Sequence, residues 1–183
     1  MMIRLQEKGS MHPSAVHPER HEAGEYYFKY IDLVPEGDVR ETLAAQRAEA
    51  LAFFRGIPDE RAAHRYEPGK WSIKAVLAHV NDCERLFAFR AFWFARGFDS
   101  PLPSFDQEVA DRHARPDDRS WGSHIEEFGS LRTATLDFFS HLSPEAWLRS
   151  GIASENPFSV RALGFIAAGH VIHHNRMLKE RYL

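Results

Sequence analysis

The chain has 183 residues, of which 44% are hydrophobic and 27% charged, and its formal net charge is −3 at pH 7. These values are typical of one globular domain with a real core, and the slight acidity gives no general attraction for nucleic acid or an anionic membrane. No apolar run approaches the ~20 residues of a membrane span, and the single cysteine, Cys83, excludes an internal disulfide, so we expect a cytoplasmic protein.

Residues 1–24 are polar and show no sustained hydrophobic period. We expect a flexible N-terminal arm there, because nothing in this stretch would bury enough apolar surface to hold it in place. The folded domain is then expected to cover residues 25–183.

Four long segments have apolar residues at the three- and four-residue spacing of amphipathic helices. Residues that cap or end helices lie close to their limits. The predicted helices cover residues 38–55, 72–96, 123–142 and 159–181. In the absence of a convincing strand pattern, they predict an all-α fold, a four-helix bundle.

A long connection joins the second and third predicted helices, from Gly97 to Ser123. It contains three prolines and a stretch, residues 106–113, that could form a short helix. Connections of this length inside compact domains often carry function, and this one could cross the bundle.

Three histidines are the strongest chemical signal. His170 and His174 lie four positions apart on the predicted inner face of the last helix, so their rings project from one side, about 6 Å apart along the axis. His79 lies in an apolar part of the second predicted helix and could supply a third nitrogen. Buried imidazoles need partners, and a metal ion would serve all of them. Three protein ligands with an open position are typical of a reactive metal centre.

Two alternatives stay open at this point. Each histidine could be an ordinary hydrogen-bonded core residue, and His170 could pair with His173 instead of His174, although the apolar pattern favours His174 on the inner face. The glutamate of the H-E-x-x-H motif is missing, which disfavours a thermolysin-like protease. We expect the remaining scattered histidines to be exposed: His64, His113, His124 and His141.

Several segments share the pattern of one known family. The main ones are the run Trp71-Ser72-Ile73-Lys74 that leads to His79 and the late His170-x-x-His173-His174 sequence. Further matching segments are Tyr27 to Ile31, Val34 to Asp38, Glu84-Arg85, Phe89-Arg90, Leu102 to Asp106 and Leu131-Arg132. From about residue 25 to the C-terminus, the chain resembles the DinB-like (damage-inducible protein B, YfiT-like) metal-binding superfamily.

The resemblance implies a four-helix bundle, often a homodimer, with a divalent metal bound by His79, His170 and His174. Zinc or nickel is the expected metal, and iron or manganese would also fit, because three neutral nitrogens discriminate weakly among them. Some members are thiol S-transferases or isomerases that use low-molecular-weight thiols such as bacillithiol or mycothiol, and others resemble hydrolases. We therefore expect a metal-dependent enzyme, a thiol transferase or a hydrolase, that acts on a small molecule. The alternative is a non-catalytic metal-binding stress-response module.

Three other residues could orient a ligand histidine or contact substrate: Glu84, Asp106 and Cys83. Glu84 lies about 140° around the helix from His79, so a salt bridge with an arginine is its simpler role. Asp106 lies in the long connection, which could fold over the metal. Cys83 is one turn after His79 and could face the metal, although a buried inert thiol is its simpler role. The sequence does not assign a catalytic residue.

The second predicted helix also carries aromatic side chains around most of its circumference: Phe87, Phe89, Phe92, Trp93 and Phe94. A bundle helix normally buries one stripe of its surface. Either the long connection and the N-terminal arm cover the surplus, or the aromatics form a homodimer interface.

Overall fold

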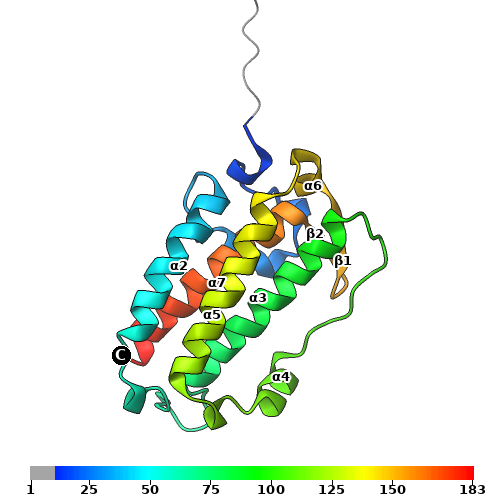
Figure 1. Ribbon diagram of the computed structural model, residues 1–183. Coiled ribbons are helices and arrows are strands. Elements are labelled where there is room, and N and C mark those ends of the chain that lie inside the picture. Colours follow the sequence, from blue (N-terminus) through cyan, green and yellow to red (C-terminus); the bar gives the residue numbers. More distant parts are fainter. Residues whose placement is uncertain (1–10) are drawn as a thin grey trace, which may run out of the picture.

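The computed structural model describes residues 11–183, and its four long helices lie side by side as a bundle (Figure 1). They are α2 (Val39–Arg55), α3 (Ile73–Ala95), α5 (Trp121–Ser140) and α7 (Val160–Arg181). The prediction of an all-α four-helix bundle with a long connection after the second helix is therefore confirmed. None of the described helices combines the length and apolar character needed to cross a membrane.

Side-chain caps begin these helices. The four capping residues are Asp38, Ser72, Ser120 and Ser159. The third long helix begins two residues before its predicted start, because the Oγ of Ser120 accepts a hydrogen bond from the backbone N–H of Ser123. Such caps contribute about 1 kcal/mol each and fix where a helix starts, and hence where its side chains point.

Shorter elements surround the bundle. α4 (Gln107–Ala114) is the short helix predicted within the long connection, and it packs on the outside of the bundle against α3 (Figure 1). The others are α1 (Phe28–Ile31), α6 (Pro144–Leu148), β1 (Ser150–Ala153), β2 (Asn156–Ser159) and 3₁₀ turns at Pro13–Ala15, Arg20–Glu22, Glu25–Tyr27, Asp59–Arg61 and Pro116–Asp118.

The antiparallel hairpin of β1 and β2 was not predicted, because its turn has an unusual composition. Ser154 and Glu155 both have left-handed backbones, with φ of 49° and 62°. Tight hairpin turns with this geometry usually contain asparagine and glycine. Leu102 hydrogen-bonds through its N–H to Ile152 O and through its carbonyl to the N–H of Ser154. The hairpin thus holds the start of the long connection beside α3.

Residues 11–24, the described part of the expected N-terminal arm, contact the bundle, which their polar and aperiodic sequence does not predict. Glu22 forms a buried ion pair with Arg161 of α7, and Ser14 and Ala23 are almost fully buried. A polar segment without periodicity can still be fixed by a few specific contacts, which no pattern of spacing reveals. Residues 1–10, the rest of the expected arm, lie outside the described residues.

A buried polar network ties three long helices together. Arg132 of α5 donates from Nε and Nη2 to the two carboxylate oxygens of Glu84 on α3, at 2.8 and 3.0 Å. Its Nη1 donates to Gln46 Oε1 of α2 at 2.8 Å. The carboxylate of Glu84 is therefore occupied by an arginine, the simpler of the two roles considered for it.

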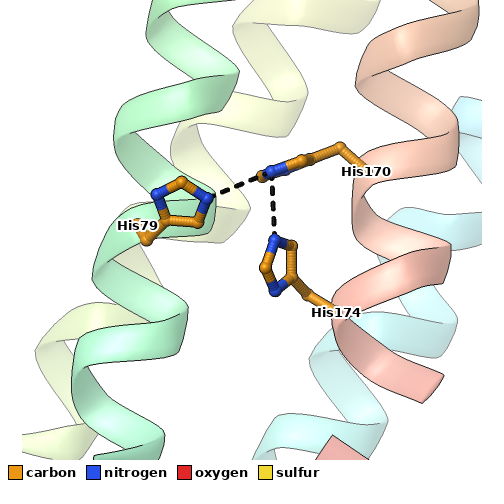
Figure 2. Close-up of side chains that lie close together, drawn as sticks. All are labelled: His79, His170 and His174. Carbon is orange, nitrogen blue, oxygen red and sulfur yellow. Dashed lines mark hydrogen bonds between the residues drawn. The ribbon is translucent and has the colours of Figure 1, made fainter. Parts of the chain in front are cut away.

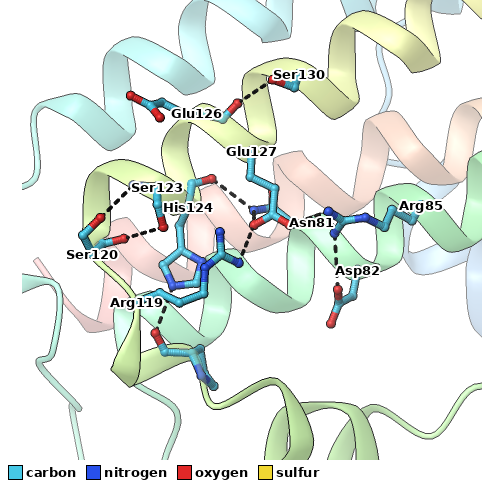
Figure 3. Close-up of polar contacts among 11 residues, drawn as sticks. Asn81, Asp82, Arg85, Arg119, Ser120, Ser123, His124, Glu126, Glu127 and Ser130 are labelled. Carbon is cyan, nitrogen blue, oxygen red and sulfur yellow. Dashed lines mark hydrogen bonds and ion pairs between the residues drawn. The ribbon is translucent and has the colours of Figure 1, made fainter.

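A second polar cluster joins α3, α5 and the end of the long connection (Figure 3). Glu127 of α5 accepts hydrogen bonds from Arg85 of α3 and from Arg119. His124 is fully buried, contrary to its predicted exposure, and its Nε2 donates to Pro116 O at 2.9 Å. The prediction failed because the 3₁₀ turn Pro116–Asp118 folds back over this helix, which spacing along the helix does not show.

The aromatic side chains of α3 divide into two groups. Phe87 and Phe94 are buried in the core, and Trp93 stacks on Phe98 with 4.2 Å between ring centroids. Phe89 and Phe92 remain 49% and 40% exposed. Packing within the chain therefore buries only some of the aromatic side chains of α3.

Candidate metal centre

The three predicted histidines meet between α3 and α7 (Figure 2). Nε2 of His170 lies 3.2 Å from Nε2 of His79 and 3.1 Å from Nε2 of His174. The side chains of His170 and His174 are buried, and that of His79 is partly buried. His173 stays outside this group and packs its ring against Tyr30, with 5.3 Å between centroids. Of the two histidines left open by the sequence, the structure therefore brings His174, and not His173, to the group.

The spacing of the three nitrogens fits one small cation. Tetrahedral ligands at about 2.0–2.1 Å from zinc stand about 3.3 Å apart, close to the 3.1 and 3.2 Å measured around His170. A neutral imidazole carries a single N–H, so Nε2 of His170 cannot donate to both neighbours, whereas a shared cation satisfies all three nitrogens. Among residues 11–183, no cysteine or carboxylate completes the group as a fourth ligand.

Burial keeps these imidazoles in the neutral form that binds metals. It lowers the pKa of His79 to about 4 and that of His174 to about 2, and it lowers the pKa of His170 well below the ordinary value of 6.5. Repulsion between neighbouring histidines lowers these pKa values further. At pH 7 the cluster therefore offers unprotonated nitrogens, and a metal need not displace protons to bind.

Close packing of α1 against α7 fixes the position of His170. Gly169 precedes it, and a Cβ at that glycine would lie 2.0 Å from Tyr30 O. Only a residue without a side chain permits this approach. The approach brings the Tyr30 ring to 5.1 Å from the His170 ring, while Phe87 approaches from α3 at 5.5 Å. Aromatic rings on two sides limit the orientations that the imidazole of His170 can adopt.

Two of the other candidates have clear positions on α3. Cys83 is buried, and its Sγ lies 3.6 Å from Nε2 of His79, but it is not part of the three-nitrogen group. Burial raises the pKa of the Cys83 thiol to about 12, so the thiol stays protonated at pH 7. Glu84, paired with Arg132, is not brought to the histidines.

The third candidate, Asp106, caps α4 by accepting hydrogen bonds from the N–H groups of Glu108 and Val109. Its neighbour Gln107, rather than Asp106 itself, lines the space beside the histidines. The long connection thus contributes Phe105 and Gln107, but not Asp106, to the space beside the histidines. None of the described carboxylates bonds to the second ring nitrogen of a cluster histidine.

Two cavities open onto the histidine cluster. One, of about 240 Å³, is lined by His79 and His170 together with Cys83, Arg90 and several aromatic side chains. The other, of about 390 Å³, is lined by His79 and His174. A larger groove of about 610 Å³ between α2 and α7 contains none of the three histidines, so cavity size alone does not locate the site.

Arg90 was not among the predicted site residues. It follows His79 by 11 positions on α3, which is close to three full helical turns, so the two share a face. That spacing was visible in the sequence. The spacing alone does not predict a site residue, because arginines on helices are mostly exposed.

Comparison with known proteins identifies the family. A model of the DinB superfamily matches residues 42–178, about three quarters of the chain. The chain belongs to the DinB superfamily. The matched region contains all three cluster histidines, and the family resemblance expected from the sequence is confirmed. No curated protein sequence matches this DinB-superfamily chain.

Two solved structures share its fold. YfiT from Bacillus subtilis, described as a probable metal-dependent hydrolase with an unusual four-helix bundle topology, matches with a TM-score of 0.66 and 15% identity over 89% of each chain. A mycothiol-dependent maleylpyruvate isomerase matches with a TM-score of 0.62 and 13% identity, over 79% of this chain and 61% of the isomerase. This DinB-superfamily chain thus spans less than two thirds of the isomerase, and identities this low establish the fold alone.

Proposed function

We propose that this protein is a metal-dependent enzyme whose divalent cation is bound by His79, His170 and His174. The convergence of three neutral imidazole nitrogens beside two cavities is the observation that carries the proposal. Such a cation supplies Lewis acidity, which lowers the pKa of a bound water or thiol. Zinc or nickel suits this set of ligands, and iron or manganese would also be accepted.

The surroundings of the cluster support turnover rather than metal storage. A storage or structural site would be closed by a fourth protein ligand. The two candidates for that position do not fill it, since Cys83 lies outside the three-nitrogen group and Asp106 caps α4. The side of the cluster that faces the cavities is therefore available for substrate.

Two reactions fit this arrangement: transfer of a low-molecular-weight thiol to an electrophile, and hydrolysis. The relatives support both, since one is described as a metal-dependent hydrolase and the other as a mycothiol-dependent isomerase. We place the thiol reaction first, because a soft thiolate is a good ligand for zinc and nickel. A non-catalytic metal-binding module is the competing function.

Metal analysis of purified variants tests the ligand assignment. Wild type is expected to bind one equivalent of zinc or nickel, and His79→Ala and His170→Ala are expected to lose it. His173→Ala is the matched control, because His173 neighbours the cluster without joining it. Stoichiometric metal in either ligand variant would refute the assignment.

An activity screen separates the two classes of function. Protein loaded with zinc or nickel is incubated with small thiols plus electrophiles, and separately with ester and amide substrates, using His170→Ala as the inactive control. Turnover that disappears in this control supports an enzyme. A protein that binds one equivalent of metal and turns over none of these substrates supports the non-catalytic module.

We also propose that the protein forms a homodimer through the exposed aromatic side chains of α3. Phe89 and Phe92 are 49% and 40% exposed, and exposed aromatic residues are enriched at protein contacts. Light scattering at micromolar concentration is expected to give the mass of a dimer for wild type and of a monomer for Phe89→Ser/Phe92→Ser. A monomeric wild type would contradict the proposal.

A further inference from the structure

Three arginines in the described chain are at least nine-tenths buried, and one of them differs from the other two. Arg132 pairs with Glu84, and Arg161 pairs with Glu22, so each of these cations has its own buried carboxylate. Arg90 is only 1% exposed, yet it forms no ion pair with any of residues 11–183. Within residues 11–183, one buried guanidinium thus has no counter-ion.

The hydrogen bonds of Arg90 hold its side chain in place and leave part of it free. Nη2 donates to Pro103 O at 3.1 Å and to Ser154 Oγ at 2.8 Å. Nε is buried and has no hydrogen-bond partner. Both partners of Nη2 are neutral, so neither offsets the charge. Burying a cation in this state costs several kcal/mol, and a buried N–H without an acceptor adds to that cost.

Arg90 faces the same cavity as the histidine cluster. The cavity of about 240 Å³ is lined by Arg90 as well as by His79 and His170. Residues 79 and 90 are separated by 11 positions, or about 16 Å along the helix axis. A long side chain on a helix points back towards the N-terminus, which is the direction of His79 from Arg90.

We propose that Arg90 binds a carboxylate group of the substrate, placing the reactive end of a small molecule at the histidine cluster. A planar carboxylate matches the fork of a guanidinium and would supply both the missing charge and the acceptor for Nε. The placement of the reactive end of the substrate at the histidine cluster rests on the proposed function. The binding of an anion by Arg90 rests only on the contacts of the Arg90 side chain.

The shape of the cavity narrows the class of substrate. Its volume of about 240 Å³ is below the ~300–1,000 Å³ of pockets for drug-sized ligands, so the ligand is small. Aromatic side chains form much of its wall: Tyr26, Tyr27, Tyr30, Phe87 and Phe105. These rings would contact the uncharged body of the ligand. The cavity therefore fits a small organic acid with an apolar or aromatic body.

Binding of simple carboxylates to the metal-loaded protein tests this assignment. Calorimetric titrations use benzoate, 3-phenylpropionate and adipate, with benzamide as a neutral match for benzoate and inorganic phosphate as a different anion. We expect at least one carboxylate to bind, and benzamide and phosphate to bind about tenfold more weakly or worse. Absence of binding by all three carboxylates, or tighter binding of phosphate, would overturn the proposal.

Variants separate Arg90 from the metal as the anion-binding group. Arg90→Gln is expected to weaken carboxylate binding about tenfold or more while it retains one equivalent of metal. Arg90→Lys keeps the charge without the fork and is expected to fall between. Arg85→Gln is the matched control, because Arg85 lies on the same helix, pairs with Glu127 and does not line the cavity. Unchanged affinity in Arg90→Gln would overturn the proposal.

Wild type stripped of metal with EDTA makes the two proposals fail independently. If Arg90 is the anchor, the stripped protein still binds carboxylates. If carboxylate binding disappears together with the metal but survives Arg90→Gln, the anion binds the metal and the Arg90 proposal is wrong. If wild type binds no metal, the proposed function fails, and the same titrations still test Arg90. Circular dichroism checks that each variant is folded, and the benzoate–benzamide comparison on wild type needs no variant.

Discussion

The buried ion pair between Glu84 and Arg132 leads to a quantitative prediction about stability. The two side chains are 2% and 0% exposed, and Arg132 also donates to Gln46. Glu84→Leu removes the carboxylate and leaves the guanidinium buried without a counter-ion. Removing one partner of a buried pair costs about 3–5 kcal/mol. Because each kcal/mol shifts the Tm of a domain of this size by about 2–4 °C, we expect Tm to fall by roughly 6–20 °C.

The double variant distinguishes an uncompensated charge from a simple loss of packing. Arg132→Met alone is expected to destabilise by a similar amount, because it leaves the carboxylate of Glu84 buried. Glu84→Leu/Arg132→Met removes both charges and is expected to recover most of the loss. Recovery stays incomplete, since Oε1 of Gln46 loses its donor.

Urea denaturation of the four metal-free proteins completes a double-mutant cycle. We expect a coupling free energy of at least about 2 kcal/mol. Arg85→Met is the control, because its pair with Glu127 joins the same two helices while Arg85 is 47% exposed. An exposed pair is worth at most about 1 kcal/mol. If the two single losses simply add in the double variant, the reasoning about the buried pair is refuted.

Three other predictions follow from the site and its supports. Gly169→Ala places a Cβ 2.0 Å from Tyr30 O and must displace α1, so we expect metal affinity to fall at least tenfold. Competition with a chromophoric chelator measures this affinity. An unchanged affinity would contradict the role of Gly169 in positioning His170. Burial opposes ionisation of Glu22, but hydrogen bonds from Arg161 and Ser159 outweigh it and hold the pKa of Glu22 below its ordinary 4.5. The ionised pair therefore stabilises the fold above pH 4.5 and loses this effect as the pH falls through the lowered pKa. Urea denaturation between pH 7 and 3 should show this loss in wild type and a shallower one in Glu22→Gln, and parallel curves would argue against it. Free zinc at 100 times its Kd should raise the unfolding free energy of wild type by up to about 2.7 kcal/mol, reversibly with EDTA, whereas an equal increase in His79→Ala would show binding elsewhere.

The helices were predictable because the signals that start and end them act over a few residues. Ser72 and Ser159 cap α3 and α7 as expected, and these caps fix which side chains face inward. The hairpin was missed because Ser154 and Glu155 adopt a backbone that their residue types do not favour. The sequence therefore predicts the bundle well and its irregular connections poorly.

The histidine cluster was predictable for a related reason, since two of its members are one turn apart on a single helix. The roles of Glu84 and Arg90 were harder to assign, because each depends on a residue far away in the chain. Glu84 pairs with a residue 48 positions away, and Arg90 donates to one 64 positions away. His124 shows a different limit, since its partner Pro116 is only eight positions away but lies in a turn outside the helix. Local patterns find ligands that share a helix, while tertiary contacts decide the charges around them.

The 91 positions between His79 and His170 have a consequence for how tightly the fold itself holds a cation. An ion that joins these residues would act as a reversible crosslink that closes a loop of about half of the chain. In the denatured chain His170, His173 and His174 remain neighbours and can still chelate the same ion. Binding to both states reduces the stabilisation that the ion gives to the native protein. Folding therefore contributes to metal affinity by adding His79 as a ligand. The metal affinity of a peptide of residues 160–183 would measure what the histidines of α7 contribute without the fold.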